Sequence, residues 1–165
     1  MKSRGRSVRK HLFALLAQGE LDEALAKIDR FPPRQIVNPL LSLIQSGNDK
    51  VKWGAVKATG RVVSRLADGD LESARVIVRR LMWTLNDESG GIGWGSPEAM
   101  GEILAVHGVL GREYAHILLS YAREEGNFLE HEGLQRGLLW GIGRLGEKRP
   151  ELVRSSAGLF LPYLK

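Results

Sequence analysis

Aromatic and acidic side chains concentrate in residues 83–102, and their types indicate binding chemistry. Indole rings attract cations through their π faces, and carboxylates attract them by charge. Glu98 and Glu102 are four residues apart, so they share one face if this segment is helical. The set therefore predicts a site for a cationic ligand or a basic peptide. The candidate partner-binding residues are Trp83, Asn86, Asp87, Glu88, Trp94, Glu98 and Glu102.

The linker between Trp83 and Trp94 has a second interpretation. It is longer than the neighbouring linkers and, with Gly95, holds four glycines. Long loops on rigid scaffolds often carry function. In the alternative, the glycines only let the chain turn, and Trp94 only fills the gap between packed helices. The sequence leaves both interpretations open.

The same carboxylates do not predict an enzyme. Two acids act as general acid and base when their surroundings separate their pKa values, but no nucleophile or substrate pattern accompanies these. The glycines of residues 90–93 lack the preceding strand and the Lys-Ser/Thr ending of a phosphate-binding loop. We therefore expect no catalytic residue and no cofactor.

The formal net charge of +5 is unevenly distributed. The first ten residues hold five basic and no acidic side chains, whereas residues 82–132 hold nine acidic and two basic ones. Such asymmetry concerns partners and solubility rather than fold. Basic side chains near one helical stripe keep nucleic acid as the alternative partner, although a solvated helix face is the simpler interpretation. These candidate nucleic-acid-binding residues are Lys50, Lys57, Arg61 and Arg65.

Composition also bounds the compartment and the number of domains. The 165 residues contain no cysteine, which excludes disulfides and thiolate metal sites. No apolar run reaches the roughly 18 residues of a membrane span. The basic start is not followed by the cleavage site of a signal peptide. We expect one domain over residues 1–165, a cytoplasmic location and no membrane partner, and we leave the oligomeric state open.

Helical periodicity dominates the chain, and no segment alternates as a strand would. Asn48 or Asp49 can cap the helix that starts near Val51, and Ser96 before Pro97 is an N-cap candidate for another. The loops are mostly short, which favours antiparallel neighbours. Helices are expected at residues 7–18, 21–28, 36–44, 51–66, 71–85, 96 to about 110, 112–124, 128–146 and 150–161.

One helical pattern occurs twice. Residues 49–61 and 132–144 both begin with an acid, carry an aliphatic residue two positions later and share two glycine positions, the second followed by arginine. Glycine inside a helix costs about 1 kcal/mol relative to alanine, so Gly54, Gly60, Gly137 and Gly143 predict close approach of helices. Residues 96–108 form a degenerate middle copy, which keeps Gly101 but lacks the acid and the second glycine.

The pattern D-x-V-K-x-x-A-x-x-A-x-G over residues 49–60 resembles the first helix of HEAT-like repeats, including the short type found in phycobilisome-lyase-like proteins. The resemblance covers residues 34–165. It implies an α-solenoid of about four antiparallel helix pairs, with residues 1–33 as an irregular capping pair. Since HEAT-like proteins mostly bind macromolecules through a groove, it implies a non-enzymatic interaction module that binds a protein or peptide through its groove and the 86–96 loop.

Two HEAT-like families define the alternatives. The deoxyhypusine hydroxylases among them bind a di-iron centre through recurring His-Glu pairs at helix starts. This chain has one such pair, His131-Glu132, and the matching residues 48–49 and 95–96 include no histidine, so we expect no metal. The alkylpurine DNA glycosylases combine aromatic and acidic residues with basic flanks. A nucleic-acid-binding or DNA-base-repair protein is therefore the alternative function.

Overall fold

The computed structural model describes residues 2–164, and every regular element in that range is a helix. The expected all-α class is confirmed, and no strand occurs among the described residues. The elements are α1 (Lys2–Gln18), α2 (Leu21–Ile28), α3 (Pro33–Leu43), α4 (Asp49–Gly69), α5 (Leu71–Thr84), the 3-10 helix η1 (Asp87–Ser89), α6 (Ser96–Val106), α7 (Gly108–Ser120), α8 (Glu132–Lys148), and the 3-10 helices η2 (Pro150–Leu152) and η3 (Arg154–Leu164).

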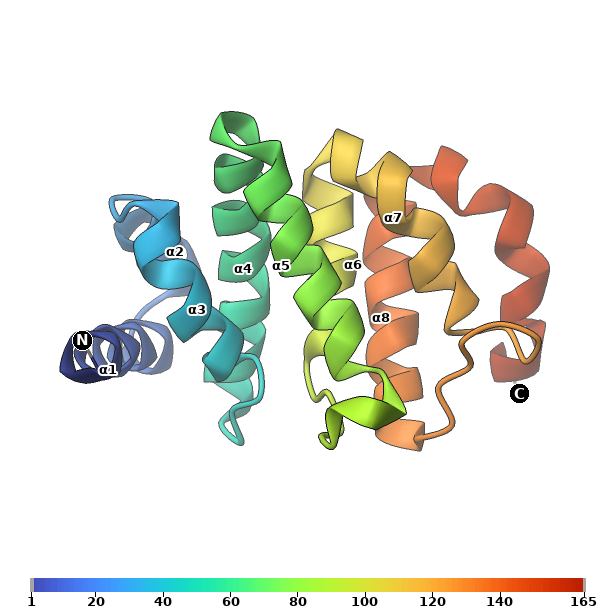
Figure 1. Ribbon diagram of the computed structural model, residues 1–165, viewed down its shortest axis with the longest axis horizontal. Coiled ribbons are helices and arrows are strands. Elements are labelled where there is room, and N and C mark those ends of the chain that lie inside the picture. The colour runs from blue at the N-terminus through green and yellow to red at the C-terminus, as the bar shows by residue number, and fades with distance from the viewer. Residues whose placement is uncertain (1, 165) are drawn as a thin grey trace.

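From α3 onward the α-helices lie in two rows (Figure 1). α4, α6 and α8 lie side by side in one row, and α3, α5 and α7 pack against them in the other. The helices of the first row run opposite to those of the second, because each connection joins consecutive helices at the same end of the two rows. Two of these connections, residues 85–95 and 121–131, are long. α1 crosses the end of both rows and contacts α3 and α4.

α6 is the most enclosed helix. Every residue from Ser96 to Ala105 is buried, since α4 and α8 flank the helix while α5 and α7 pack against it. One continuous apolar cluster extends past it, from Leu12 in α1 to Leu145 in α8. The side chains of α6 therefore determine what the two flanking helices must accommodate.

The glycines of the repeated pattern lie at close helix contacts, as expected. A Cβ on Gly101 of α6 would overlap the backbone of Gly141 in α8, and a Cβ on Gly141 would come within 2.6 Å of the Pro97 carbonyl oxygen. A Cβ on Gly54 would lie 2.8 Å from Leu16 of α1. Gly143 is the exception, because nothing lies within 4 Å of the position that its Cβ would take.

The expected start of α6 needs one correction. Ser96 is the first helical residue rather than the N-cap, and its hydroxyl lies 2.6 Å from that of Thr84. The N-cap is Gly95, at a φ of 79°. A Cβ on Gly95 would overlap the carbonyl group of Ile44 at the end of α3, so both the space and the left-handed backbone require glycine here.

Histidine side chains cap the two helices that follow, which shifts the expected boundaries. His107 breaks the predicted helix 96–110 in two: its backbone is extended, and its Nδ1 accepts a hydrogen bond from the Leu110 amide at 3.4 Å. His131 caps α8 through the Gly133 amide at 3.1 Å, so that helix begins at Glu132 rather than at residue 128.

Of the two predicted caps of α4, Asn48 is the one that the structure uses, and its side chain accepts a hydrogen bond from the Val51 amide. The segment expected as a ninth helix consists of η2 and η3.

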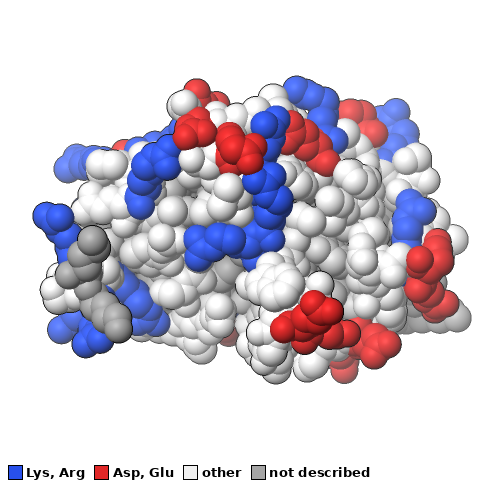
Figure 2. All heavy atoms as spheres, in the orientation of Figure 1, with Lys and Arg blue, Asp and Glu red and all other residues white. Residues whose placement is uncertain are grey.

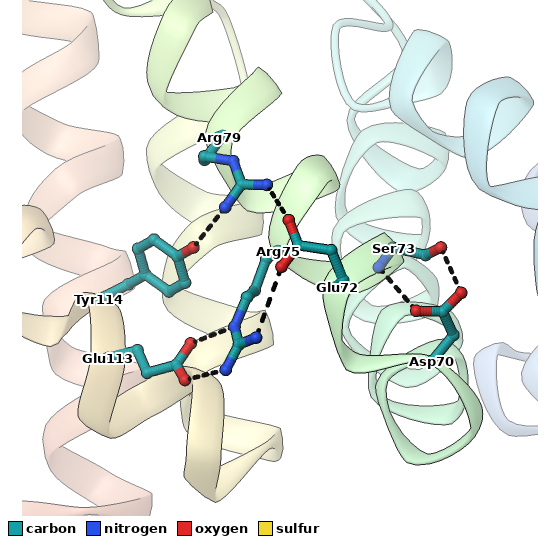
Figure 3. A network of polar contacts seen from close by, with 7 residues as sticks. All are labelled: Asp70, Glu72, Ser73, Arg75, Arg79, Glu113 and Tyr114. Atoms are coloured by element: carbon teal, nitrogen blue, oxygen red, sulfur yellow. Dashed lines mark hydrogen bonds and ion pairs between the residues drawn. The ribbon is translucent and has the colours of Figure 1, made fainter.

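An ion pair and a hydrogen bond join α5 to α7 in the second row (Figure 3). The Arg75 guanidinium donates to both oxygens of Glu113, at 2.9 and 2.5 Å, and Arg79 donates to Glu72 and to the Tyr114 hydroxyl. The hydrogen bond from Arg75 lowers the pKa of Glu113, and the one from Arg79 lowers the pKa of Glu72. These side chains are partly exposed, so salt and pH act on them directly.

Replacement of Gly101 by alanine should lower the free energy of unfolding by about 1–3 kcal/mol, because the new methyl group meets backbone that cannot rotate away. Gly143→Ala is the matched control: the site is an open interior position of α8, so alanine should stabilise the chain by about 0.5–1 kcal/mol. Urea denaturation of both variants measures the difference. Equal effects would contradict the close packing of α6 on α8.

The pair between Arg75 and Glu113 should make part of the stability depend on pH. Because the folded chain holds the pKa of Glu113 low, its contribution is present above the ordinary glutamate pKa of about 4.3 and is lost as the pH falls below it. In Arg75→Gln, the fall in unfolding free energy from about pH 7 to about pH 3 should therefore be smaller than in the wild type. Arg80→Gln is the control, because Arg80 of the same helix bonds the neutral Asn38. A steeper fall in Arg75→Gln would contradict the assignment.

Candidate functional site

The structure separates the predicted site residues into two groups. Glu98 and Glu102 lie in the interior on α6, each with only 3% of its surface exposed. The other five lie at or near the surface between the end of α5 and the start of α6. The structure therefore does not bring all seven to one exposed surface, and the two groups differ in their chemistry.

Each buried carboxylate is held by cations from the flanking helices. Glu98 pairs with Lys52 of α4 at 2.7 Å. Glu102 accepts two hydrogen bonds from the Arg144 guanidinium of α8, at 2.7 and 3.1 Å, and lies 3.4 Å from the Lys57 ammonium of α4. The bond to Glu102 raises the pKa of Arg144, which keeps the guanidinium charged. Since their negative charge is neutralised inside the protein, these acids are poorly placed to select a cationic ligand.

Glycines of the repeated pattern provide the space for both carboxylates. A Cβ on Gly137 of α8 would overlap the Glu98 carboxylate, and a Cβ on Gly60 of α4 would lie 2.6 Å from Cγ of Glu102. The arrangement is reciprocal. Glu98 lies against a glycine of α8 and pairs with α4, whereas Glu102 lies against a glycine of α4 and pairs with both neighbours.

Two tryptophans that the sequence analysis did not select bridge the flanking helices. Trp53 of α4 and Trp140 of α8 have ring centroids 4.8 Å apart at an interplanar angle of 55°. The Lys52 ammonium lies 4.9 Å from the Trp53 ring, and that of Lys57 lies 5.3 Å from the Trp140 ring. The missed signal is their position directly before Gly54 and Gly141, two glycines at close helix contacts. Together these side chains connect α4 to α8 alongside the buried acids.

The segment from Trp83 to Trp94 carries the exposed group. Its large apolar side chains are unusually accessible: Trp83 is 53% exposed, Ile92 48% and Trp94 40%. Asp87 and Glu88 of the same segment are also exposed. We name these five residues the aromatic-acidic surface. Ile92 was not in the predicted set. Its neighbours in the sequence up to Trp94 are glycines or polar residues, so no periodic apolar pattern marked it as a binding residue.

Local contacts hold this segment in one conformation. Asn86 caps η1 by accepting from the Glu88 amide at 3.0 Å, which is a structural role for a residue predicted to bind a partner. Gly93, at a φ of 83°, lies against the Thr84 carbonyl group, and Gly95 lies against Ile44. The loop is therefore fixed to α5 at one point and to α3 at another.

Trp94 combines the two roles that the sequence left open. Its ring meets the His131 imidazole edge-on, with centroids 4.9 Å apart, and a Cβ on Gly133 would lie 2.7 Å from the indole. Trp94 therefore packs on the start of α8 while keeping much of its surface in solvent. The contact also places the end of the 121–131 segment next to the 86–95 loop.

Ion pairs engage most of the basic stripe predicted for nucleic acid. Lys57 lies beside Glu102, as described, and Arg61 pairs with Asp29. Arg65 donates to the Phe31 carbonyl oxygen at 2.8 Å and lies 3.8 Å from Asp29. Lys50 is exposed. The structure thus leaves little of the stripe free to meet a phosphate backbone.

Comparison with protein-family models, with curated proteins and with solved structures finds no match for this chain. In residues 2–164 no helix has both the length and the hydropathy to cross a lipid bilayer. Over the same part of the chain, no three histidine, aspartate or glutamate side chains are grouped to hold a metal ion.

Removal of the Arg144 side chain should cost about 3–5 kcal/mol, because it leaves much of the buried Glu102 charge uncompensated. We expect this loss in the unfolding free energy of Arg144→Leu. The control is Arg136→Leu, which breaks an exposed pair with Glu132 on the same helix and should cost less than about 1 kcal/mol. If both variants are equally stable, the buried pairs are not structural and the cluster is free to serve a ligand.

Proposed function

We propose that the chain is a non-enzymatic interaction module, an α-solenoid of about four HEAT-like antiparallel helix pairs that binds a protein or peptide through its aromatic-acidic surface. Two features support the architecture. One is the repeated pattern of residues 49–61 and 132–144, and the other is the alternating direction of helices in two rows. Repeats of this kind stack on their neighbours and present extended binding surfaces.

The observation that carries the proposed function is the exposure of Trp83, Ile92 and Trp94 within one short segment. Large apolar side chains gathered at a surface and rimmed by polar groups mark interaction sites. Tryptophan is also among the residue types that dominate binding energy at interfaces. The fixed conformation of the loop supports this role, since functional residues are often held on loops by a rigid scaffold.

The rim defines the partner's charge. Asp87 and Glu88 are exposed in the same short segment as the aromatic rings, so a partner with lysine or arginine side chains could form both ion pairs and cation–π contacts. The groove offers a partner less room at α6, because Trp53, Trp140 and the lysines that contact their rings occupy the space beside that helix. Nucleic acid has less support as a partner, since three of its four candidate cations lie beside carboxylates.

A labelled peptide rich in arginine and leucine should bind the protein, whereas the same peptide with glutamate in place of arginine should not. Trp83→Ala and Trp94→Ala should each weaken binding at least about tenfold, the loss expected for an aromatic anchor. Fluorescence anisotropy measures the affinity, and thermal unfolding checks that each variant remains folded. Val76→Ala is the matched control, because Val76 is an exposed apolar residue of α5 outside the surface.

Unchanged affinity in both tryptophan variants would rule out the aromatic-acidic surface as the binding site. A wild type that binds neither peptide, but binds duplex DNA with a steep salt dependence, would favour the nucleic-acid alternative instead.

A further inference from the structure

We infer that the partner of the aromatic-acidic surface is a second copy of this chain, which inserts the basic start of its helix α1. The inference rests on the function proposed above and names the partner. It rests on the opposite charges of two separate surfaces of the molecule and on the exposure of both surfaces to solvent.

The acidic side of the contact is larger than the 86–95 loop alone. Because Trp94 contacts His131, the end of the 121–131 segment and the start of α8 extend the same surface. The extension adds the exposed carboxylates of Glu130 and Glu132, of which Glu132 also pairs with Arg136. Figure 2 shows acidic side chains over the segment that contains η1 and, farther right, near the segment that follows α7. Glu124 and Glu125, nearer the start of the 121–131 segment, are also exposed.

The basic side of the contact is the first part of α1. Residues 3–7 are all exposed, and Val8 is the first partly buried position. Arg4, Arg6, Arg9 and Lys10 are all exposed, and Arg9 also donates to the Ser42 hydroxyl at 2.9 Å. No acid stands in the first turn of the helix. Positive side chains at the positive end of the helix dipole are unfavourable. A partner that supplies carboxylates would remove this repulsion.

The two surfaces lie apart on the molecule, so one copy cannot satisfy both by itself. α1 is at one end of the rows, while the 86–95 loop and the 121–131 segment lie toward the other half (Figure 1). Basic side chains surround the α1 end in Figure 2. The contact between copies therefore joins two unlike surfaces, the basic start of α1 on one copy and the aromatic-acidic surface on another.

Arginine chemistry fits the mixture of rings and acids. A guanidinium plane can stack on an indole face while its N–H groups pair with a carboxylate. Arg4 and Arg6 would provide these contacts to the tryptophans and to Asp87 and Glu88 of the next copy. Since all of these groups are exposed, the association should be weak and sensitive to salt.

Two charge-reversal variants test the inference on the full chain. The first is Arg4→Glu with Arg6→Glu, which reverses the basic surface. The second is Asp87→Lys with Glu88→Lys, which reverses the acidic surface. Sedimentation velocity over a range of concentrations should show association of the wild type at about 20 mM salt and its loss at about 0.5 M, where the screening length is short. The control is Lys148→Glu with Glu151→Lys, which changes exposed charges outside both surfaces and should associate like the wild type.

Each reversal variant alone should be monomeric, since both surfaces of every contact must match. In a mixture of the two variants, the intact basic helix of the second can bind the intact acidic surface of the first. The reversed helix of the first can likewise bind the reversed surface of the second, so the mixture should regain association although neither variant associates alone. A chain that carries all four substitutions should associate again, because both surfaces have changed sign together.

A wild type that stays monomeric at low salt, or a mixture of the two variants that does not associate, overturns the inference. The peptide experiment separates this failure from failure of the proposed function. If the arginine-rich peptide still binds in a manner that depends on Trp83 and Trp94, the surface is an interaction site with a partner other than this chain. If both experiments fail, the proposed function fails as well.

Discussion

The structure depends on the placement of two carboxylates inside it. Glu98 and Glu102 lie one turn apart on the most enclosed helix, and removing such charges from water is costly unless each is paired. Each acid therefore requires a cation on a neighbouring helix and an absent side chain to make room. Lys52, Lys57 and Arg144 meet the first requirement, and Gly60 and Gly137 meet the second. Buried ion pairs add little to stability over apolar packing, but each acid meets its cation and its glycine in the observed register. A shift of one helix of the first row along another would separate these partners.

This constraint explains why the repeated pattern changes in its middle copy. In α4 and α8 the glycines of the pattern recur at matching places, and Gly60 and Gly137 lie against the two acids of α6. A third identical copy would carry aliphatic residues in place of Glu98 and Glu102, and Lys52, Lys57 and Arg144 would lose their partners. The departure of residues 96–108 from the pattern is thus complementary to the copies on either side. At the close contact of Gly101 with Gly141, the backbones of α6 and α8 also fit together.

Local features of the sequence predicted local structure well. The helical class, most helix positions, the Asn48 cap and the need for close approach at the glycines all follow from periodicity and backbone chemistry. The pairing of Glu102 with Arg144 did not, because 42 residues separate them and no local pattern links them. The same limit hid the contact of Trp53 with Trp140. It also made Glu98 and Glu102 look available to a ligand, since exposure is a property of the assembled helices. The sequence made Ser96 a plausible N-cap, but the N-cap is Gly95. Helix packing brings the Ile44 carbonyl group so close to position 95 that only glycine fits there.

Gly93 and Gly95 fix the loop before α6 to two different helices of the second row, the first to Thr84 of α5 and the second to Ile44 of α3. A free loop loses backbone entropy of about 1–2 kcal/mol for each residue that binding immobilises. Much of that loss has already occurred here during folding, so the tryptophans are pre-organised for whatever they contact. The affinity for a partner therefore depends on the stability of the helices that hold Gly93 and Gly95 in place. Substitutions in the packing beneath the loop can then weaken binding without touching the surface that binds.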